Sequence, residues 1–167
     1  MRRSAVWLSC ALCLAPLGAR AVAEASDPWS GAYRLEWVKG SAAVERSGAA
    51  SQTLVVAKAA DADPANLVER YRADLSRWTL REATGSEQGR SLRRFVERDY
   101  EGLGWNALHA AGGIECLDGG HLFVCRTQPG TTVALGPEGP KRETLIAQTG
   151  VFGIVLHAGA FELKKLD

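Results

Sequence analysis

Short stretches in which apolar and polar residues alternate predict β-strands in this chain. The first is Gly31–Val38, where Tyr33, Leu35 and Trp37 are separated by charged residues. Successive side chains of a strand point to opposite faces of a sheet, so these three apolar side chains share one face. A second strand is expected at Gln52–Ala57, whose central residues are all apolar and therefore suit a strand buried on both faces.

The strongest helical pattern lies at Pro64–Trp78. Asp63 is a favourable N-cap, and proline suits the first helical turn because its missing N–H would have no partner there. Apolar residues then recur at intervals of one to four positions, which places them on one side of a helix. These residues are Leu67, Val68, Tyr71, Leu75 and Trp78. The pattern predicts a well-defined amphipathic helix that covers one face of a sheet.

The segment 91–100 fits two structures. Leu92, Phe95, Val96 and Tyr100 would lie on one face of a helix, but the segment also fits a twisted strand. We expect a helix at 91–100 and keep the strand as the alternative.

The rest of the chain predicts a series of short strands. Turns rich in glycine and proline separate apolar runs. These runs are Thr131–Leu135, Glu143–Gln148, Val151–Leu156 and Phe161–Leu166. The expected fold class is therefore α+β, a mainly antiparallel sheet with one well-defined helix at 64–78, a second at 91–100 and a C-terminal β meander.

A predicted β-hairpin at Gly113–Gly130 contains two of the four cysteines. Turn-forming residues at 118–121 separate two short apolar runs, and this arrangement places Cys116 directly opposite Cys125. Opposed residues in an antiparallel pair bring their Cβ atoms to about 4.5–5.5 Å, so slight closure permits a disulfide. The hairpin therefore predicts a cross-strand disulfide.

A metal site is the alternative for this hairpin. His121, with Glu115 or His109, could add ligands to the two cysteines. Zinc sites favour cysteines separated by two to four residues, and here the separation is wider. We therefore expect a disulfide between Cys116 and Cys125, no metal and no cofactor, and two unrelated free thiols are the remaining alternative.

The N-terminus predicts export. Two arginines precede an apolar run at 5–17, and an Ala-x-Ala sequence ends at Ala23, which is the plan of a secretory signal peptide. We expect residues 1–23 to be removed and residues 24–167 to form a single exported domain, periplasmic or secreted. Disulfides persist in such oxidising compartments.

Loss of this leader would also change the charge. It removes three arginines and no acidic residue, so the formal net charge changes from +1 to −2. A domain this close to neutrality lacks the strongly positive surface that nucleic acid and anionic lipid attract. No later segment is apolar over the roughly 20 residues that a spanning helix needs. We expect neither nucleic-acid binding nor stable membrane insertion.

Sequence motifs for catalysis are missing. The chain contains no Gly-x-Ser-x-Gly, His-Glu-x-x-His, phosphate-binding glycine loop or Cys-x-x-Cys sequence. Candidate binding residues are instead Asp118 and His121 in the hairpin turn, Trp105 on a loop, and Arg126 just after the disulfide. The structural alternatives are that Asp118 caps the turn, Trp105 packs against a sheet edge and Arg126 forms a surface ion pair.

The function expected from these features is binding without catalysis. A disulfide-bonded hairpin is rigid, and a rigid polar tip loses little entropy when it docks. We expect a small exported binding module, of inhibitor or immunity type, that inserts the hairpin tip into a protein partner in the cell envelope or outside the cell. The alternatives are a small envelope hydrolase with His121 as general base, and a small-ligand carrier whose pocket lies between the sheet and helix 64–78.

Overall fold

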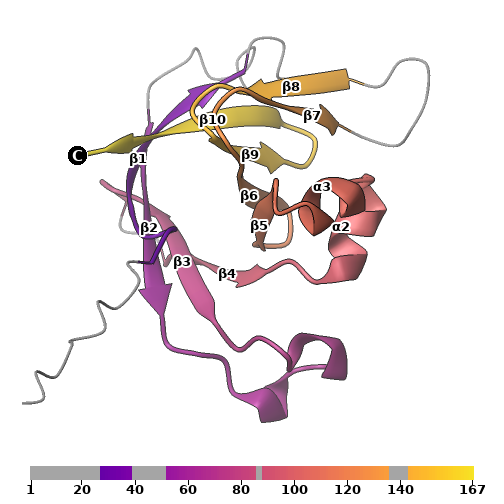
Figure 1. Cartoon of the computed structure of the whole chain (residues 1–167). Helices are drawn as coiled ribbons and strands as arrows, with labels where there is room; N and C mark the ends of the chain where they lie inside the picture. Colours follow the sequence, from indigo (N-terminus) through magenta and orange to yellow (C-terminus); the bar gives the residue numbers. More distant parts are fainter. Residues whose placement is uncertain (1–26, 39–51, 86–87, 136–142) are drawn as a thin grey trace, which may run out of the picture.

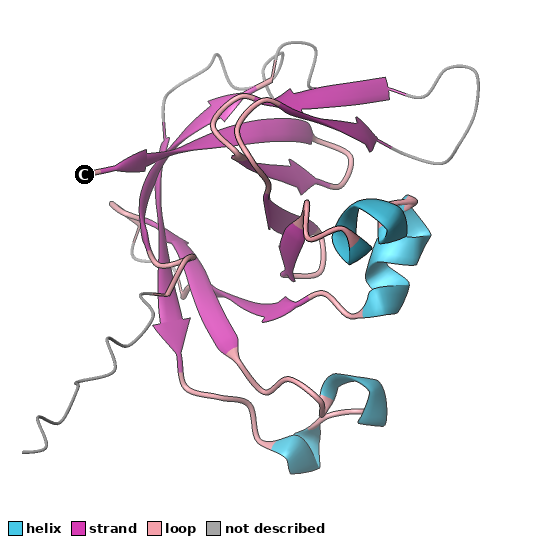
Figure 2. Cartoon of the chain, in the orientation of Figure 1, coloured by secondary structure: helices cyan, strands magenta, loops and turns pink. Residues whose placement is uncertain are grey.

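The computed structural model describes residues 27–38, 52–85, 88–135 and 143–167. Strands account for most of the regular structure in these ranges, and the helical segments are short (Figures 1 and 2). The predicted signal peptide at 1–23 lies outside the described residues.

Eight antiparallel strands form a closed barrel in the order β1-β10-β9-β6-β5-β4-β3-β2. The strands are β1 (Gly31–Trp37), β2 (Gln52–Ala59), β3 (Arg77–Glu82), β4 (Arg90–Arg94), β5 (Glu115–Asp118), β6 (Leu122–Arg126), β9 (Val151–Val155) and β10 (Gly159–Leu166). Neighbours in the barrel are also neighbours in the sequence, except where β6 pairs with β9 and where β1 closes on β10. Between β6 and β9 in the sequence lie β7 (Thr131–Leu135) and β8 (Glu143–Ala147), which form a separate two-stranded sheet.

The barrel is filled by side chains from every strand. Alternate residues point inward, and the fully enclosed ones form one apolar core. Its members are Trp29, Tyr33, Leu35, Leu54, Val56, Trp78, Leu80, Leu92, Leu117, Val124, Phe161 and Leu163, with β9 contributing Val151 and Val155 at its border. The barrel thus encloses a packed interior.

A second core covers part of the outer wall of the barrel. Two short helices, α2 (Glu97–Leu103) and α3 (Asn106–Ala110), connect β4 to β5 and pack there together with β7 and β8. The buried residues of this layer are Tyr100, Trp105, Ile114, Cys116, Phe123, Cys125, Val133, Leu145, Ala147, Phe152 and Ala160. Strands β5, β6, β9 and β10 are therefore buried on both faces.

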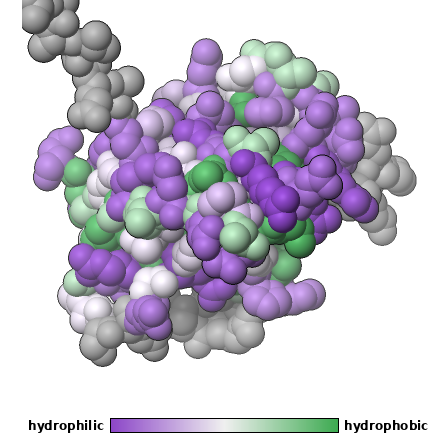
Figure 3. All heavy atoms as spheres, turned by 90° about the horizontal axis from the view of Figure 1, so that it is seen from below, coloured by the Kyte–Doolittle hydropathy of each residue, from purple (hydrophilic) through white to green (hydrophobic). Residues whose placement is uncertain are grey.

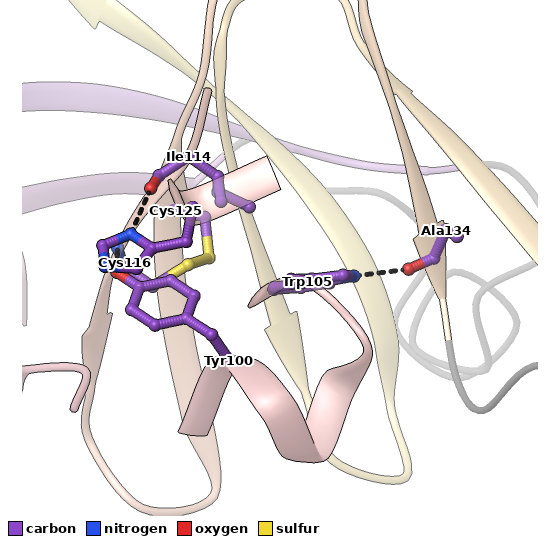
Figure 4. The surroundings of a disulfide bond; sticks show 7 residues. Tyr100, Trp105, Ile114, Cys116, Cys125 and Ala134 are labelled. Carbon is purple, nitrogen blue, oxygen red and sulfur yellow. Dashed lines mark hydrogen bonds between the residues drawn. A yellow bond between two sulfur atoms is a disulfide. The ribbon is translucent and has the colours of Figure 1, made fainter. Parts of the chain in front are cut away.

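The predicted hairpin and its disulfide are confirmed. Cys116 lies opposite Cys125 in the β5–β6 pair, and a disulfide joins them with their Cα atoms 4.1 Å apart. The Cys116 backbone makes its hydrogen bonds on the other side, because its carbonyl accepts from the Phe95 N–H (3.0 Å) and its N–H donates to the Tyr100 hydroxyl (3.0 Å). Where β4 ends, the Tyr100 hydroxyl of α2 thus accepts the β5 hydrogen bond that no strand residue accepts, next to the disulfide (Figure 4).

The segment just before β1 occupies the end of the barrel at which β1 begins. The Asp27 carboxylate accepts hydrogen bonds from Trp78 Nε1 (2.9 Å), the Trp29 backbone N–H (3.2 Å) and the Ser30 hydroxyl. The two indole rings meet edge to face, with centroids 6.5 Å apart. Burial alone would raise the pKa of Asp27, but these hydrogen bonds and the nearby Lys58 charge outweigh it, so the pKa lies below its usual value.

The prediction of a helix at Pro64–Trp78 is wrong. The proline begins only a single 3-10 turn, capped by Asp63 as predicted, and Leu67 then adopts an extended conformation. Trp78 belongs to β3, where it pairs with both neighbouring strands and is buried inside the barrel. Val68 is 58% exposed, so the apolar stripe has no surface against which to pack. Burial of Trp78 and the ladder hydrogen bonds prevail over the local helical pattern.

The helix expected at 91–100 is also wrong. Residues up to Arg94 form β4, because Leu92 is buried inside the barrel while its neighbours pair with β3 and β5. A helix begins only at Glu97. The C-terminal strands lie close to their predicted positions but do not form one meander, since β7 and β8 leave the barrel. The fold class is therefore an antiparallel β-barrel and not α+β.

A substitution at Gly153 tests the close packing inside the barrel. An added Cβ would lie 2.1 Å from Cζ of Phe161, so Gly153→Ala should lower the free energy of unfolding by about 1–3 kcal/mol. Gly102→Ala is the matched control, because its Cβ meets no atom within 4 Å and alanine favours helix α2 by about 0.5–1 kcal/mol. Urea unfolding measures both. Equal effects of the two substitutions would contradict this packing.

The lowered pKa of Asp27 predicts a pH dependence of stability. The ionised Asp27 carboxylate stabilises the fold at pH values above the pKa that Asp27 has in the unfolded chain. This contribution is lost as the pH falls through the lower pKa that Asp27 has in the folded protein. Asp27→Asn should reduce the free energy of unfolding at pH 7 by about 1–2 kcal/mol. The difference from wild type should shrink below about pH 4, as measured by urea unfolding across pH. A constant difference would contradict the prediction.

Candidate functional site: a cleft between the β2–β3 arm and helix α2

The element that projects from the barrel is the connection between β2 and β3, which we call the arm (residues 60–76) (Figure 1). It contains the 3-10 turns η1 (Pro64–Asn66) and η2 (Glu69–Tyr71). A backbone hydrogen bond from Ala62 to Leu75 (2.8 Å) closes its base. The arm therefore has a defined shape although it contains no α-helix.

Arg93 of β4 fixes the arm to the barrel. Its guanidinium lies over the Tyr71 ring, 4.1 Å from the centroid, and donates to the Tyr71 hydroxyl (3.3 Å). The same side chain pairs with Asp99 of α2 at 2.8 Å and with Asp118 of β5 at 2.6 Å. Arg93 thus connects the arm, the barrel and the helix, and its single positive charge is shared between two carboxylates.

A cleft of about 510 Å³ lies between the arm and α2. Tyr71, Phe95, Val96 and Leu103 supply its apolar surface. The charged residues that line it are Arg70, Arg98, Asp99 and Asp118. Figure 3, which shows the molecule from the side of the arm, has apolar surface in separate patches among polar side chains.

A second hollow of about 330 Å³ adjoins the cleft. It shares Arg70 and Tyr71 with the cleft, and Asp74, Arg94 and Glu97 also line it. Arg94 pairs with Asp74 at 3.1 Å, which ties the arm to β4 a second time. The two hollows therefore form one groove along the arm, with Tyr71 between them.

The two arginines of the cleft differ from Arg93 in their partners. The Arg70 guanidinium also lies against the Tyr71 ring, 4.7 Å from its centroid. Within the described ranges neither Arg70 nor Arg98 pairs with a carboxylate, whereas Asp99 and Asp118 are both held by Arg93. Arg70 and Arg98 are therefore the charged residues of the cleft that have no partner of opposite sign in the described structure.

The structure places the predicted site residues in different surroundings. Asp118 lines the cleft, and its second carboxylate oxygen accepts from the Gly120 N–H (2.7 Å), so it also caps the turn. His121 is exposed in that turn. Trp105 is buried in the outer core and donates to the Ala134 carbonyl at 2.7 Å (Figure 4). Arg126 lies over the Trp29 ring, 5.4 Å from its centroid, and forms the expected surface ion pair, with Glu115 at 3.9 Å.

The geometry around His121 does not assemble a general base. Its ring forms no hydrogen bond with a carboxylate or a hydroxyl in the part of the chain that the structure describes, and Asp118 is held by Arg93 instead. A general base in acyl transfer needs an orienting partner and a nucleophile within reach. The described residues also contain no group of three His, Cys, Asp or Glu side chains that could hold a metal.

Sequence reasoning missed the residues of the cleft apart from Asp118. Arg70 lies in the helix expected at 64–78 and Arg93 in the one expected at 91–100, and neither was among the candidate binding residues. The useful signal was the alternation of buried Trp78 and Leu80 with polar neighbours, which indicates a strand and so makes the preceding residues a connection.

No helix among the described residues has both the length and the apolar character needed to cross a membrane.

Arg93 should contribute more to stability than its neighbour Arg94. Arg93→Met leaves two carboxylates without their cation, and the Arg93 side chain is only 18% exposed, so the free energy of unfolding should fall by about 2 kcal/mol. Arg94→Met is the matched control and should cost less than about 1 kcal/mol, because its ion pair is 38–40% exposed. Thermal and urea unfolding compare the two. Equal losses would show that Arg93 is not the central contact.

Comparisons with known proteins supply no relative from which to infer a function, because no family model, no curated protein and no solved structure matches the chain.

Proposed function

We propose that this chain is a small exported binding module that engages a protein partner through the cleft between the arm and α2. The observation that carries the proposal is a formed cleft with an apolar surface and two arginines, Arg70 and Arg98, that have no carboxylate partner in the described structure. Aromatic residues and arginine are enriched at protein interfaces, so a cleft that combines Tyr71 and Phe95 with these arginines suits a protein partner.

The walls of the cleft support binding because the protein already holds them in place. Arg93 joins Tyr71 of the arm to Asp99 of α2 and Asp118 of β5. Behind α2, the Tyr100 hydroxyl is bound to the backbone of Cys116, which the disulfide links to β6. A site that is ordered before binding loses less conformational entropy when a partner docks.

The hairpin turn itself is less suited to the inserting role expected from the sequence. The Gly119 carbonyl accepts from Arg90 (3.0 Å), and the His121 carbonyl accepts from the Leu156 N–H (2.9 Å). These contacts hold the turn against neighbouring parts of the barrel. In this proposal the disulfide-bonded hairpin contributes through Asp118 in the wall of the cleft, and the arm is the element that reaches toward the partner.

The proposal places the partner in the cell envelope or outside the cell, in keeping with the predicted leader at 1–23. A small binding domain without catalytic motifs suits an inhibitor or an immunity-type protein, in which binding alone produces the effect. The hydrolase alternative has no support in the surroundings of His121. The carrier alternative was tied to a pocket between the sheet and the helix expected at 64–78, and that helix does not form.

Filling the cleft tests this function. A Cβ at Gly102 meets no atom within 4 Å, so Gly102→Trp should occupy the cleft without disturbing the fold. The oxidised mature domain is used to capture proteins from the envelope and medium of its own cells, and mass spectrometry identifies them. A stoichiometric partner that is captured by wild type should be lost with Gly102→Trp.

Ala107→Trp is the matched control, because Ala107 is an exposed residue of α3 that does not line the cleft. It should retain the partner. Capture that survives Gly102→Trp but is lost with His121→Ala would overturn the proposal and favour the hairpin turn. Failure of wild type to retain any stoichiometric protein would also overturn it.

A further inference from the structure

We infer that the cleft recognises an acidic segment of its protein partner, in which a carboxylate side chain is next to an apolar or aromatic one. The inference rests on the proposed function, since it specifies the chemistry that the same cleft selects. It is argued from the charges and contacts of the cleft alone.

The charge of the cleft favours a carboxylate. Its own acids are already engaged, because Asp99 and Asp118 both pair with Arg93 at 2.8 Å or less. Arg70 and Arg98 have no such partner within the described residues. A ligand carboxylate would therefore meet two cations without displacing an existing ion pair. A basic ligand would have to compete with Arg93 for the two acids.

The orientation of Arg70 strengthens this preference. The Tyr71 ring contacts both Arg70, at 4.7 Å, and Arg93, at 4.1 Å, measured from the ring centroid. Stacking of a guanidinium on an aromatic ring limits its motion and leaves its N–H groups free at the edge. These groups match the two oxygens of a carboxylate, and paired arginine–carboxylate hydrogen bonds are among the stronger ones in proteins.

The apolar part of the ligand follows from the floor of the cleft. Phe95 and Leu103 are partly buried hydrophobic residues packed against the outer core, and with Val96 they line the cleft. The volume of about 510 Å³ holds a few side chains. An apolar or aromatic side chain beside the carboxylate would cover this surface.

The shape of the site favours a segment of polypeptide. The cleft continues past Tyr71 into the second hollow, so an extended chain can lie along the arm. Arg70 lines both hollows, and Arg93 and Arg94 also line the second one.

Defined peptides test the inference. The probe is a fluorescein-labelled peptide with Glu-Phe-Glu in a Gly/Ser context, and the matched peptides carry Gln-Phe-Gln or Glu-Ser-Glu. Fluorescence anisotropy measures their affinity for the oxidised mature domain. The Glu-Phe-Glu peptide should bind at least about tenfold more tightly than either matched peptide, as expected for charge-assisted hydrogen bonds joined to apolar contact. Its affinity should fall as the salt concentration rises.

The double variant Arg70→Gln/Arg98→Gln should weaken binding of the Glu-Phe-Glu peptide by about tenfold or more. The control Arg34→Gln/Arg81→Gln makes the same change in net charge at exposed arginines that do not line the cleft, and it should alter affinity by less than about twofold. Equal weakening by both double variants would overturn the inference, because general attraction would then explain binding.

Two further outcomes separate the inference from the proposed function. Equal binding of the Gln-Phe-Gln peptide, or no binding of any peptide, would overturn the acidic preference. If partner capture were still lost with Gly102→Trp in that case, the cleft would remain the binding site and only its chemistry would be wrong. If capture did not depend on Gly102→Trp, the proposed function would fail regardless of the peptides.

Discussion

Closure of the barrel by pairing of β1 with β10 is the constraint on which the rest of the structure depends. Closure gives every one of the eight strands two partners and turns alternate side chains into a common interior. The interior has little room, and Phe161 of β10 can occupy it only because β9 carries Gly153 directly beneath its ring. Aromatic and branched side chains then fill the barrel.

The outer wall explains why this small barrel carries additional elements. Phe123 and Cys125 of β6 and Phe152 of β9 point outward, and their apolar surface has to be covered. The helices α2 and α3 cover one part of it, and β7 and β8 cover another. The disulfide lies in this second core, where Tyr100 completes the hydrogen bonding of β5. Covering the wall also places α2 opposite the arm and so creates the cleft.

Arg93 shows how one polar side chain organises the outside of the molecule. It satisfies Asp99 and Asp118 and supports Tyr71, so three separate segments share one guanidinium. The consequence for function is indirect. Because Arg93 pairs with both acids, Arg70 and Arg98 are the cleft residues that a partner carboxylate would meet in our proposal. Asp118 was selected from the sequence for its place in a turn, but it belongs to the candidate site because it pairs with Arg93 and lines the cleft.

Features that depend on neighbours in the sequence could be predicted from it. The register that opposes Cys116 and Cys125 follows from the length of one turn, and the strand at 31–38 and the C-terminal strands follow from alternation and from glycine-rich turns. The segment 64–78 could not be assigned in this way, because its apolar spacing fits a helix and only pairing with β2 and β4 makes Trp78 a strand residue. Local pattern determined the hairpin, its disulfide and several strands. Barrel closure, the arm and the partners of Arg93 were decided by the tertiary structure, since each depends on contacts between residues far apart in the chain.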